Sequence, residues 1–253
     1  MNERKEFLRL IENANHTFSG WDFSFISGTG RMASGPLDWS YGTQALRLMQ
    51  NAQSLLDMGT GGGEFLSMLR PFPPVIFATE AYEPNIPLAK AKLEPMGVKV
   101  MGIEEDNDLP FENGQFDTII NKHEAYSVSE IQRILQPGGV FLTQQVGGKD
   151  CLEINEALGA DIEGEYDHWT LDYAVKELKE AGLHIINSGE QYPVQRFYDI
   201  GALVYYLTAI PWQVEGFSAE KYLDELFYIH KQIEEKGYYE VKQHRFFIRA
   251  VNK

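Results

Sequence analysis

The sequence predicts an α/β fold: a doubly wound, mainly parallel seven-stranded sheet with an N-terminal cap and a helical insertion before the last strand. Short apolar segments alternate with helical patterns, as in strands joined by right-handed crossovers. The most informative segment is QSLLDMGTGGGEFLSML, residues 53–69, where an apolar strand runs into four glycines and then a helix. In open α/β sheets, such a turn lies at the carboxyl end of a strand, where ligands bind.

The composition favours one large domain over a membrane or nucleic-acid-binding protein. The chain has 253 residues and a formal net charge of −15, so a surface that neutralises phosphates is not expected. No apolar run approaches the roughly 20 residues of a membrane span, and the first residues lack the apolar core of a signal peptide. We therefore expect a cytoplasmic protein. Cys151 is the only cysteine and the histidines are scattered, so no metal site is expected.

Residues 1–52 are expected to form the N-terminal cap. Residues 3–14 have the apolar spacing of an amphipathic helix. Residues 18–42 are rich in glycine and serine, but also in aromatic side chains, which indicates a packed irregular segment rather than a disordered linker. Residues 38–51 should form a helix with Asp38 as its N-cap.

Residues 53–197 are expected to form the core of the fold. After the strand that ends at Asp57, the pattern predicts strands over residues 75–79, 98–101, 116–121, 140–146 and 183–188, and helices over residues 84–95, 127–136 and 170–181. Residues 198–242 should be a helical insertion over the ligand edge of the sheet, interrupted at Ile210–Pro211. Residues 243–253 should supply the last strand.

The glycine turn departs from two common nucleotide-binding motifs. The dinucleotide fingerprint G-x-G-x-x-G requires a third glycine where this chain has Glu64, and the terminal Gly-Lys-Ser/Thr of a P-loop is absent. The run from Asp57 to Gly63, DMGTGGG, instead resembles the acid-x-Gly-x-Gly-x-Gly motif of the class I, seven-stranded S-adenosylmethionine (SAM)-dependent methyltransferases.

Further segments extend this resemblance over residues 53–146. Glu80 ends the second strand, where the family has an acid that binds both ribose hydroxyls, because a carboxylate can accept two hydrogen bonds. The loop that ends at Leu109-Pro110-Phe111 resembles the adenine-binding segment of the family, in which an acidic side chain meets the adenine amino group and a backbone N–H meets a ring nitrogen. Glu105 takes the place of the acidic side chain and Asp106 that of the backbone N–H. A one-residue shift of the alignment would exchange the two. The run ILQPGG, residues 134–139, resembles the turn before the fifth strand.

The resemblance implies SAM as the cofactor and assigns residues to its site. The implied cofactor-binding residues are Asp57, Gly59, Thr60, Gly61, Gly63, Glu80, Ala81, Glu105, Asp106 and Asn121. In the family the end of the fourth strand lies beside the transferable methyl group, so His123 and Glu124 are the candidate catalytic residues, as a base or as substrate contacts. The alternative for His123 is packing against the cofactor or capping the next helix.

The expected substrate side combines the N-terminal cap with the end of the fifth strand. Its candidate residues are Trp21, Trp39, Tyr41, Gln144 and Gln145, with core packing as the alternative for the aromatic side chains. Arg31, in the same cap, is a candidate partner for the carboxylate of the cofactor.

The predicted function is methyl transfer from SAM to a small-molecule acceptor. An acidic surface and a single enclosing cap favour a small acceptor over nucleic acid. Two alternatives remain open at this point: a methyltransferase that acts on RNA or protein, and a SAM-binding protein without transferase activity.

Overall fold

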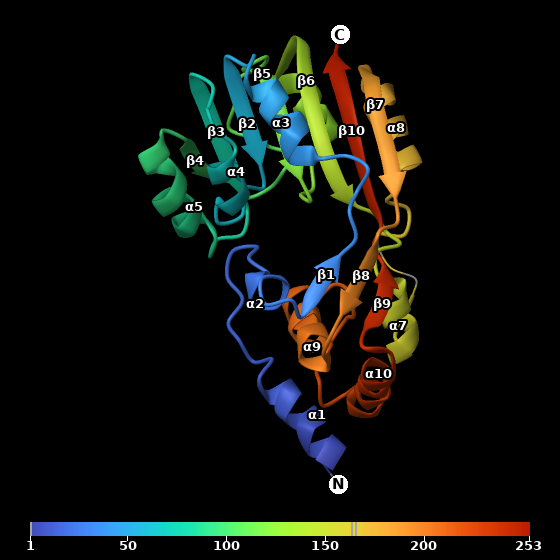
Figure 1. The fold of residues 1–253 in the computed structure, drawn as a ribbon. Coiled ribbons are helices and arrows are strands. Elements are labelled where there is room, and N and C mark those ends of the chain that lie inside the picture. Colours follow the sequence, from blue (N-terminus) through green and yellow to red (C-terminus); the bar gives the residue numbers. More distant parts are fainter. Residues whose placement is uncertain (1, 163, 165) are drawn as a thin grey trace.

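The structure is a computed structural model that describes residues 2–162, 164 and 166–253. Residues 1, 163 and 165, which fall within the predicted cap and core, lie outside the described residues. The chain builds two sheets, a large one near the C-terminus and a small one nearer the N-terminus (Figure 1).

The large sheet has seven strands in the order β4-β3-β2-β5-β6-β10-β7. β10 is antiparallel to both neighbours, β6 and β7, and the remaining pairs are parallel. The strands are β2 (Ser54–Met58), β3 (Val75–Glu80), β4 (Lys99–Gly102), β5 (Phe116–Lys122), β6 (Leu135–Val146), β7 (Leu183–Gln191) and β10 (Arg245–Asn252). The predicted seven-stranded, mainly parallel sheet is confirmed.

Helices cover both faces of this sheet, which makes the fold doubly wound as predicted. One apolar cluster joins the sheet to α3 (Tyr41–Met49), α4 (Glu64–Met68) and α5 (Ile86–Leu93). The other joins it to α6 (Val128–Ile134) and α8 (Leu171–Glu180). A short 3-10 helix, η1 (Glu94–Met96), follows α5. Apolar burial on both faces explains why the central strands read as continuous apolar runs.

The small sheet is a structural feature that the sequence did not predict. It consists of β1 (Met32–Ser34), β8 (Val194–Phe197) and β9 (Tyr239–Lys242), with β8 antiparallel to both neighbours. Five helices belong to this part of the molecule: α1 (Asn2–Glu12), α2 (Ser24–Ser27), α7 (Leu152–Leu158), α9 (Ile200–Ala209) and α10 (Leu223–Lys236). They share one apolar cluster with the small sheet. Figure 1 places this part beyond the carboxyl ends of the parallel strands.

Several helix ends follow the sequence closely and others do not. α8 is capped by Thr170, and α9 ends before Pro211, where the sequence predicts a break. α3 begins at Tyr41 and is capped by Ser40 rather than Asp38, whose carboxylate accepts a hydrogen bond from Gln191. Among the helices of the described residues, none combines the length and apolarity that a membrane crossing requires.

Candidate active site

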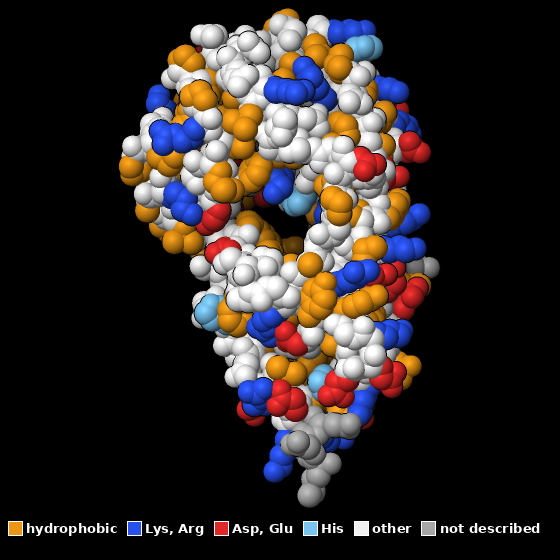
Figure 2. Space-filling model, in the orientation of Figure 1, with side chains coloured by type: hydrophobic (Ala, Val, Ile, Leu, Met, Phe, Trp, Pro, Cys, Tyr) orange, Lys and Arg blue, Asp and Glu red, His pale blue; other side chains and the backbone are white. Residues whose placement is uncertain are grey.

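An opening separates the large sheet from the small sheet. Figure 2 shows this opening, with basic, acidic and histidine side chains around it. The carboxyl ends of β2, β3, β5 and β6 point toward it in Figure 1. We call this opening the recess. It lies where open α/β sheets bind their ligands.

The glycine turn after β2 can be built only with glycine. Gly59, Gly61 and Gly63 have φ values of 66°, 63° and 80°, in the left-handed region that side chains disfavour. Space is also short. A Cβ atom on Gly59 would lie 2.3 Å from Cγ of Glu124, and one on Gly61 would lie 2.9 Å from Cδ1 of Trp21. The turn is thus covered by an acid from the end of β5 and an aromatic ring from the N-terminal segment.

Glu80 anchors the glycine turn from the end of β3. Its buried carboxylate accepts a hydrogen bond of 2.6 Å from Gly61 N–H and one of 2.8 Å from Tyr82 N–H. Burial raises the pKa of Glu80, while these backbone bonds act in the opposite direction. A carboxylate has about four lone-pair positions, so Glu80 retains acceptor capacity for a diol. Ala81, the next residue, is exposed at the same edge.

Asp57 is a buried acid at the end of β2. Desolvation raises its pKa to about 7, although the nearby positive charge of Lys122 opposes the shift. Lys122, at the end of β5, is half-buried, and its Nζ lies 4.3 Å from the ring centre of Phe65. Thr60 is also buried, and its backbone N–H donates to Thr79 O at 3.0 Å. Lys122 is not among the predicted site residues, although it directly precedes His123.

Glu124 is a second acid with a strongly raised pKa. Burial, with the negative charges of Asp106 and Glu80, raises the pKa of Glu124 to about 7. Asp106 is itself half-buried, and desolvation raises its pKa, whereas Glu105 is exposed. Of the two acids in the predicted adenine loop, the structure therefore brings Asp106 into electrostatic contact with the site.

Asn121 and Gln145 form a buried amide network behind Glu124. Asn121 Oδ1 accepts hydrogen bonds from Thr143 Oγ1 at 2.9 Å and from Gln145 Nε2 at 2.7 Å. Gln145 Nε2 also lies 3.0 Å from the backbone oxygen of Glu124. Asn121 pairs with Met58 and with Thr143 across the sheet, so the network is held by three adjacent strands. It fixes the backbone that carries Glu124.

His123, Gln144 and Trp39 form a second chain of contacts. Trp39 Nε1–H donates to Gln144 Oε1 at 2.8 Å, and Gln144 Nε2 lies 3.0 Å from His123 Nε2. His123 has a φ of 60°, which is uncommon for a residue with a side chain and is concentrated at functional sites. Desolvation by the surrounding protein, together with the positive charges of Arg245 and Lys122, holds the pKa of His123 well below its ordinary value. The residue nevertheless keeps part of its surface exposed at the end of β5.

The remaining predicted substrate-side residues lie in different environments. Trp21 is 44% exposed and makes an edge contact with Trp212, with 5.8 Å between ring centres. Tyr41 is buried in the core, against Phe65. Only Trp21 of these two is accessible to a ligand in this conformation.

Arg31 differs from its expected role. Its guanidinium forms two hydrogen bonds, of 2.7 and 2.6 Å, with the carboxylate of Asp199. That carboxylate also caps α9 by accepting from Ala202 N–H. Nε and Nη2 of Arg31 are thus held at the N-terminus of α9, and a contact of Arg31 with the cofactor carboxylate stays a prediction.

Arg245 is a charged residue near the site that no sequence pattern indicates. It is buried, pairs with Asp150, and acts electrostatically on His123. The two partners lie far apart in the chain, so no local motif predicts their contact.

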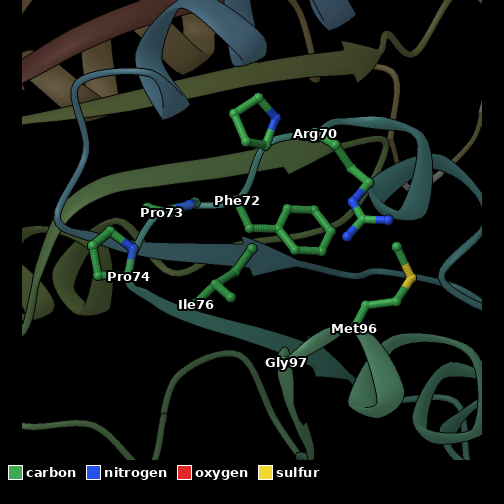
Figure 3. Close-up of a pocket in the computed structure, with 8 residues that line it drawn as sticks. Arg70, Phe72, Pro73, Pro74, Ile76, Met96 and Gly97 are labelled. Atoms are coloured by element: carbon green, nitrogen blue, oxygen red, sulfur yellow. The ribbon is translucent and has the colours of Figure 1, made fainter.

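A hollow elsewhere on the surface has a different character. It lies at the start of β3, between Arg70–Pro74 and Met96–Gly97, and has a volume of about 500 Å³ (Figure 3). Arg70 is its only charged lining residue, and no acid or amide converges there. Within the described residues, no group of three or more histidine, cysteine, aspartate or glutamate side chains is arranged to hold a metal ion.

The strand order, the glycine turn and the acid at the end of β3 define a Rossmann-like fold, and folds of this kind bind their ligands at the edge of the sheet that faces the recess. Residues 56–143 match the family model described as a methyltransferase domain. This match places a methyltransferase domain of the class I, SAM-dependent type at residues 56–143, and SAM is the cofactor of such a domain.

Solved structures with low sequence identity support the fold. A functionally unknown protein from Deinococcus radiodurans R1 is 12% identical, with all of both chains covered and a TM-score of 0.60. A proposed methyltransferase from Bacillus halodurans C-125 is 18% identical, with 83% of this chain and 96% of that chain covered and a TM-score of 0.58. The cyclase SpnF is 14% identical, with 98% and 94% covered and a TM-score of 0.55. No curated protein matches the sequence.

Proposed function

We propose that this methyltransferase acts on a small-molecule acceptor bound in the recess. The observation that carries the proposal is the position of the small sheet, which lies beyond the carboxyl ends of the parallel strands (Figure 1) and leaves the recess between the two parts of the molecule (Figure 2). A net charge of −15 gives no general attraction for RNA. A recess with protein on both sides suits a small acceptor that enters whole.

The residues around the glycine turn suit SAM in shape and charge. SAM supplies a methyl group on a positively charged sulfonium. The three left-handed glycines leave the backbone of the turn open to a ligand, and Glu80 has lone pairs left for the ribose hydroxyls. Asp57, Asp106 and Glu124 add negative charge beside the turn, which favours a cation. We assign Asp106, rather than Glu105, to the adenine side.

Glu124 is the proposed proton acceptor for an acceptor group that must lose a proton. A base works best when its pKa lies near the operating pH, and the pKa of Glu124 is raised to about 7. Gln145 Nε2 donates a hydrogen bond to the backbone oxygen of Glu124, so the backbone from which this carboxylate projects is fixed at the end of β5. Trp21 lies over Gly61 and would exclude water from the same side of the turn.

The test is a screen with methyl-labelled SAM against a cell extract separated into small-molecule, protein and RNA fractions. We expect label in the small-molecule fraction, lost in Glu124→Gln for an acceptor that needs deprotonation. Label in rRNA or protein would overturn the choice of acceptor. Label in no fraction, with SAM still bound, would favour a binding role without transfer.

A further inference from the structure

The orientation of the Gln144 amide is fixed by Trp39. An indole N–H can only donate a hydrogen bond, so the atom 2.8 Å from Trp39 Nε1 must be the amide oxygen. The NH₂ group of Gln144 therefore faces His123. The Trp39 ring is itself held against Phe247, with 4.9 Å between ring centres.

This orientation determines which nitrogen of His123 carries the proton. An amide NH₂ can only donate, and Gln144 Nε2 lies 3.0 Å from His123 Nε2. His123 Nε2 must therefore offer a lone pair, and a neutral ring carries its proton on Nδ1. The positive charges of Arg245 and Lys122 oppose a second proton on the ring.

The opposite edge of the ring is available to a ligand. Within the described residues, no group accepts a hydrogen bond from His123 Nδ1, and the side chain is exposed at the carboxyl end of β5. The backbone is fixed as well, because His123 N–H donates to Gln144 O at 2.7 Å. A left-handed backbone in a residue other than glycine is maintained only where surrounding contacts determine it.

We propose that His123 contacts the methyl acceptor as a neutral hydrogen-bond donor through Nδ1, and that Gln144 and Trp39 are positioning residues that fix this tautomer. The inference rests on the proposed function and makes it more specific. The acceptor must present a lone pair, such as a carbonyl or carboxylate oxygen, to Nδ1 while its methylated atom lies nearer Glu124. His123 is then not the base.

The first test is the tautomer of His123 in the full chain, measured by ¹⁵N–¹H correlation spectra of the histidine ring at pH 7, with and without SAM. We expect the proton on Nδ1. Trp39→Phe removes only the indole N–H, so the amide can turn and the share of the Nε2–H form should rise roughly fivefold. Trp169→Phe, in the core against Phe246, is the matched control and should change nothing. A proton on Nε2 in the wild type would overturn the proposal.

The second test separates donation from backbone geometry, with an acceptor found in the screen. Asn and Asp both tolerate a left-handed backbone, and both place a polar atom near the position of Nδ1, but only Asn can donate. His123→Asn should keep the KM for the acceptor within a few-fold, and His123→Asp should raise it roughly tenfold or more. Equal KM values for the two variants would overturn the contact. A screen without any acceptor would end the proposed function but leave the measured tautomer standing.

Discussion

The side chain of Glu124 lies directly against Gly59, where a Cβ atom would come within 2.3 Å of Glu124 Cγ. This contact joins the end of β5 to the glycine turn after β2. It places an acid with a pKa of about 7 beside the backbone that we assign to SAM.

Gly59→Ala should therefore damage both the turn and the site. The φ of 66° alone costs a residue with a side chain about 1–2 kcal/mol, and the contact with Glu124 adds to it. We expect a lower free energy of unfolding and at least tenfold weaker SAM binding by calorimetry. Gly159→Ala is the control, because its φ is 62° but a Cβ there meets nothing within 4 Å. It should lose stability and keep its affinity for SAM.

The affinity for SAM should increase with pH. Glu124 and Asp57 both have a pKa of about 7 without ligand, and a bound cation favours their ionised forms. Binding should release protons below pH 7, so the affinity rises by up to about tenfold per pH unit for each of the two groups and levels off above that value. Calorimetry in buffers of different ionisation enthalpy measures the release. Glu124→Gln should reduce the slope, and an unchanged wild-type affinity from pH 5.5 to 8 would contradict the assignment.

The effect of Asp57→Asn on the free energy of unfolding should depend on pH, because the pKa of Asp57 is raised in the folded state. The pKa is about 7 in the fold against an ordinary value of 3.8, so the folded state keeps a proton that the unfolded chain has lost. The contribution of Asp57 to stability thus falls as pH rises between these values. Relative to wild type, the Asn variant should gain stability between pH 5 and pH 8 in urea unfolding. A difference in the free energy of unfolding between the two proteins that does not change with pH would contradict the burial of the Asp57 charge.

Asp117→Asn provides a contrasting control for that experiment. The Asp117 carboxylate accepts from Gln53 N–H at 2.7 Å and from Ser54 N–H at 3.1 Å. Weakening these bonds should destabilise the protein by about 1 kcal/mol at pH 8, the opposite sign.

Arg31→Ala tests whether this arginine stabilises the fold or contacts the cofactor. Because Arg31 joins the N-terminal segment to Asp199 at the start of α9, its loss should lower the free energy of unfolding by about 1–3 kcal/mol. SAM affinity should stay within a factor of about three, a change well below 1.4 kcal/mol. A large loss of SAM affinity without a loss of stability would instead support a contact between Arg31 and the carboxylate of the cofactor.

The large sheet could be predicted because its signals are local. Gly59 and Gly61 need left-handed backbone, and the central strands contain short buried apolar runs such as Leu55–Leu56 and Ile119–Ile120, so each signal lies within a short window of sequence. The small sheet left no such signal. β1 has three residues, and Met32 pairs with Phe197, which is remote in the chain. Short strands with distant partners depend on tertiary packing, which a sequence pattern does not contain.

The candidate site shows the same division between local and long-range signals. Asp57, Glu80 and Glu124 follow strands, so their meeting at one sheet edge could be inferred. The contact of Trp39 with Gln144 joins residues 105 positions apart, and only the structure reveals it. The choice between Glu105 and Asp106 also required the loop conformation, because both are acids in the same segment.

The most direct test of the account is a calorimetric titration of SAM into the wild type and into Glu80→Gln. The Glu80 carboxylate accepts hydrogen bonds from the backbone N–H groups of Gly61 and Tyr82. Gln at position 80 has nearly the same shape, but it lacks the negative charge and one of the two acceptor oxygens. We predict saturable one-site binding by the wild type and roughly tenfold weaker binding by the variant. Equal affinities, or no saturable binding by the wild type, would contradict the placement of SAM at the glycine turn.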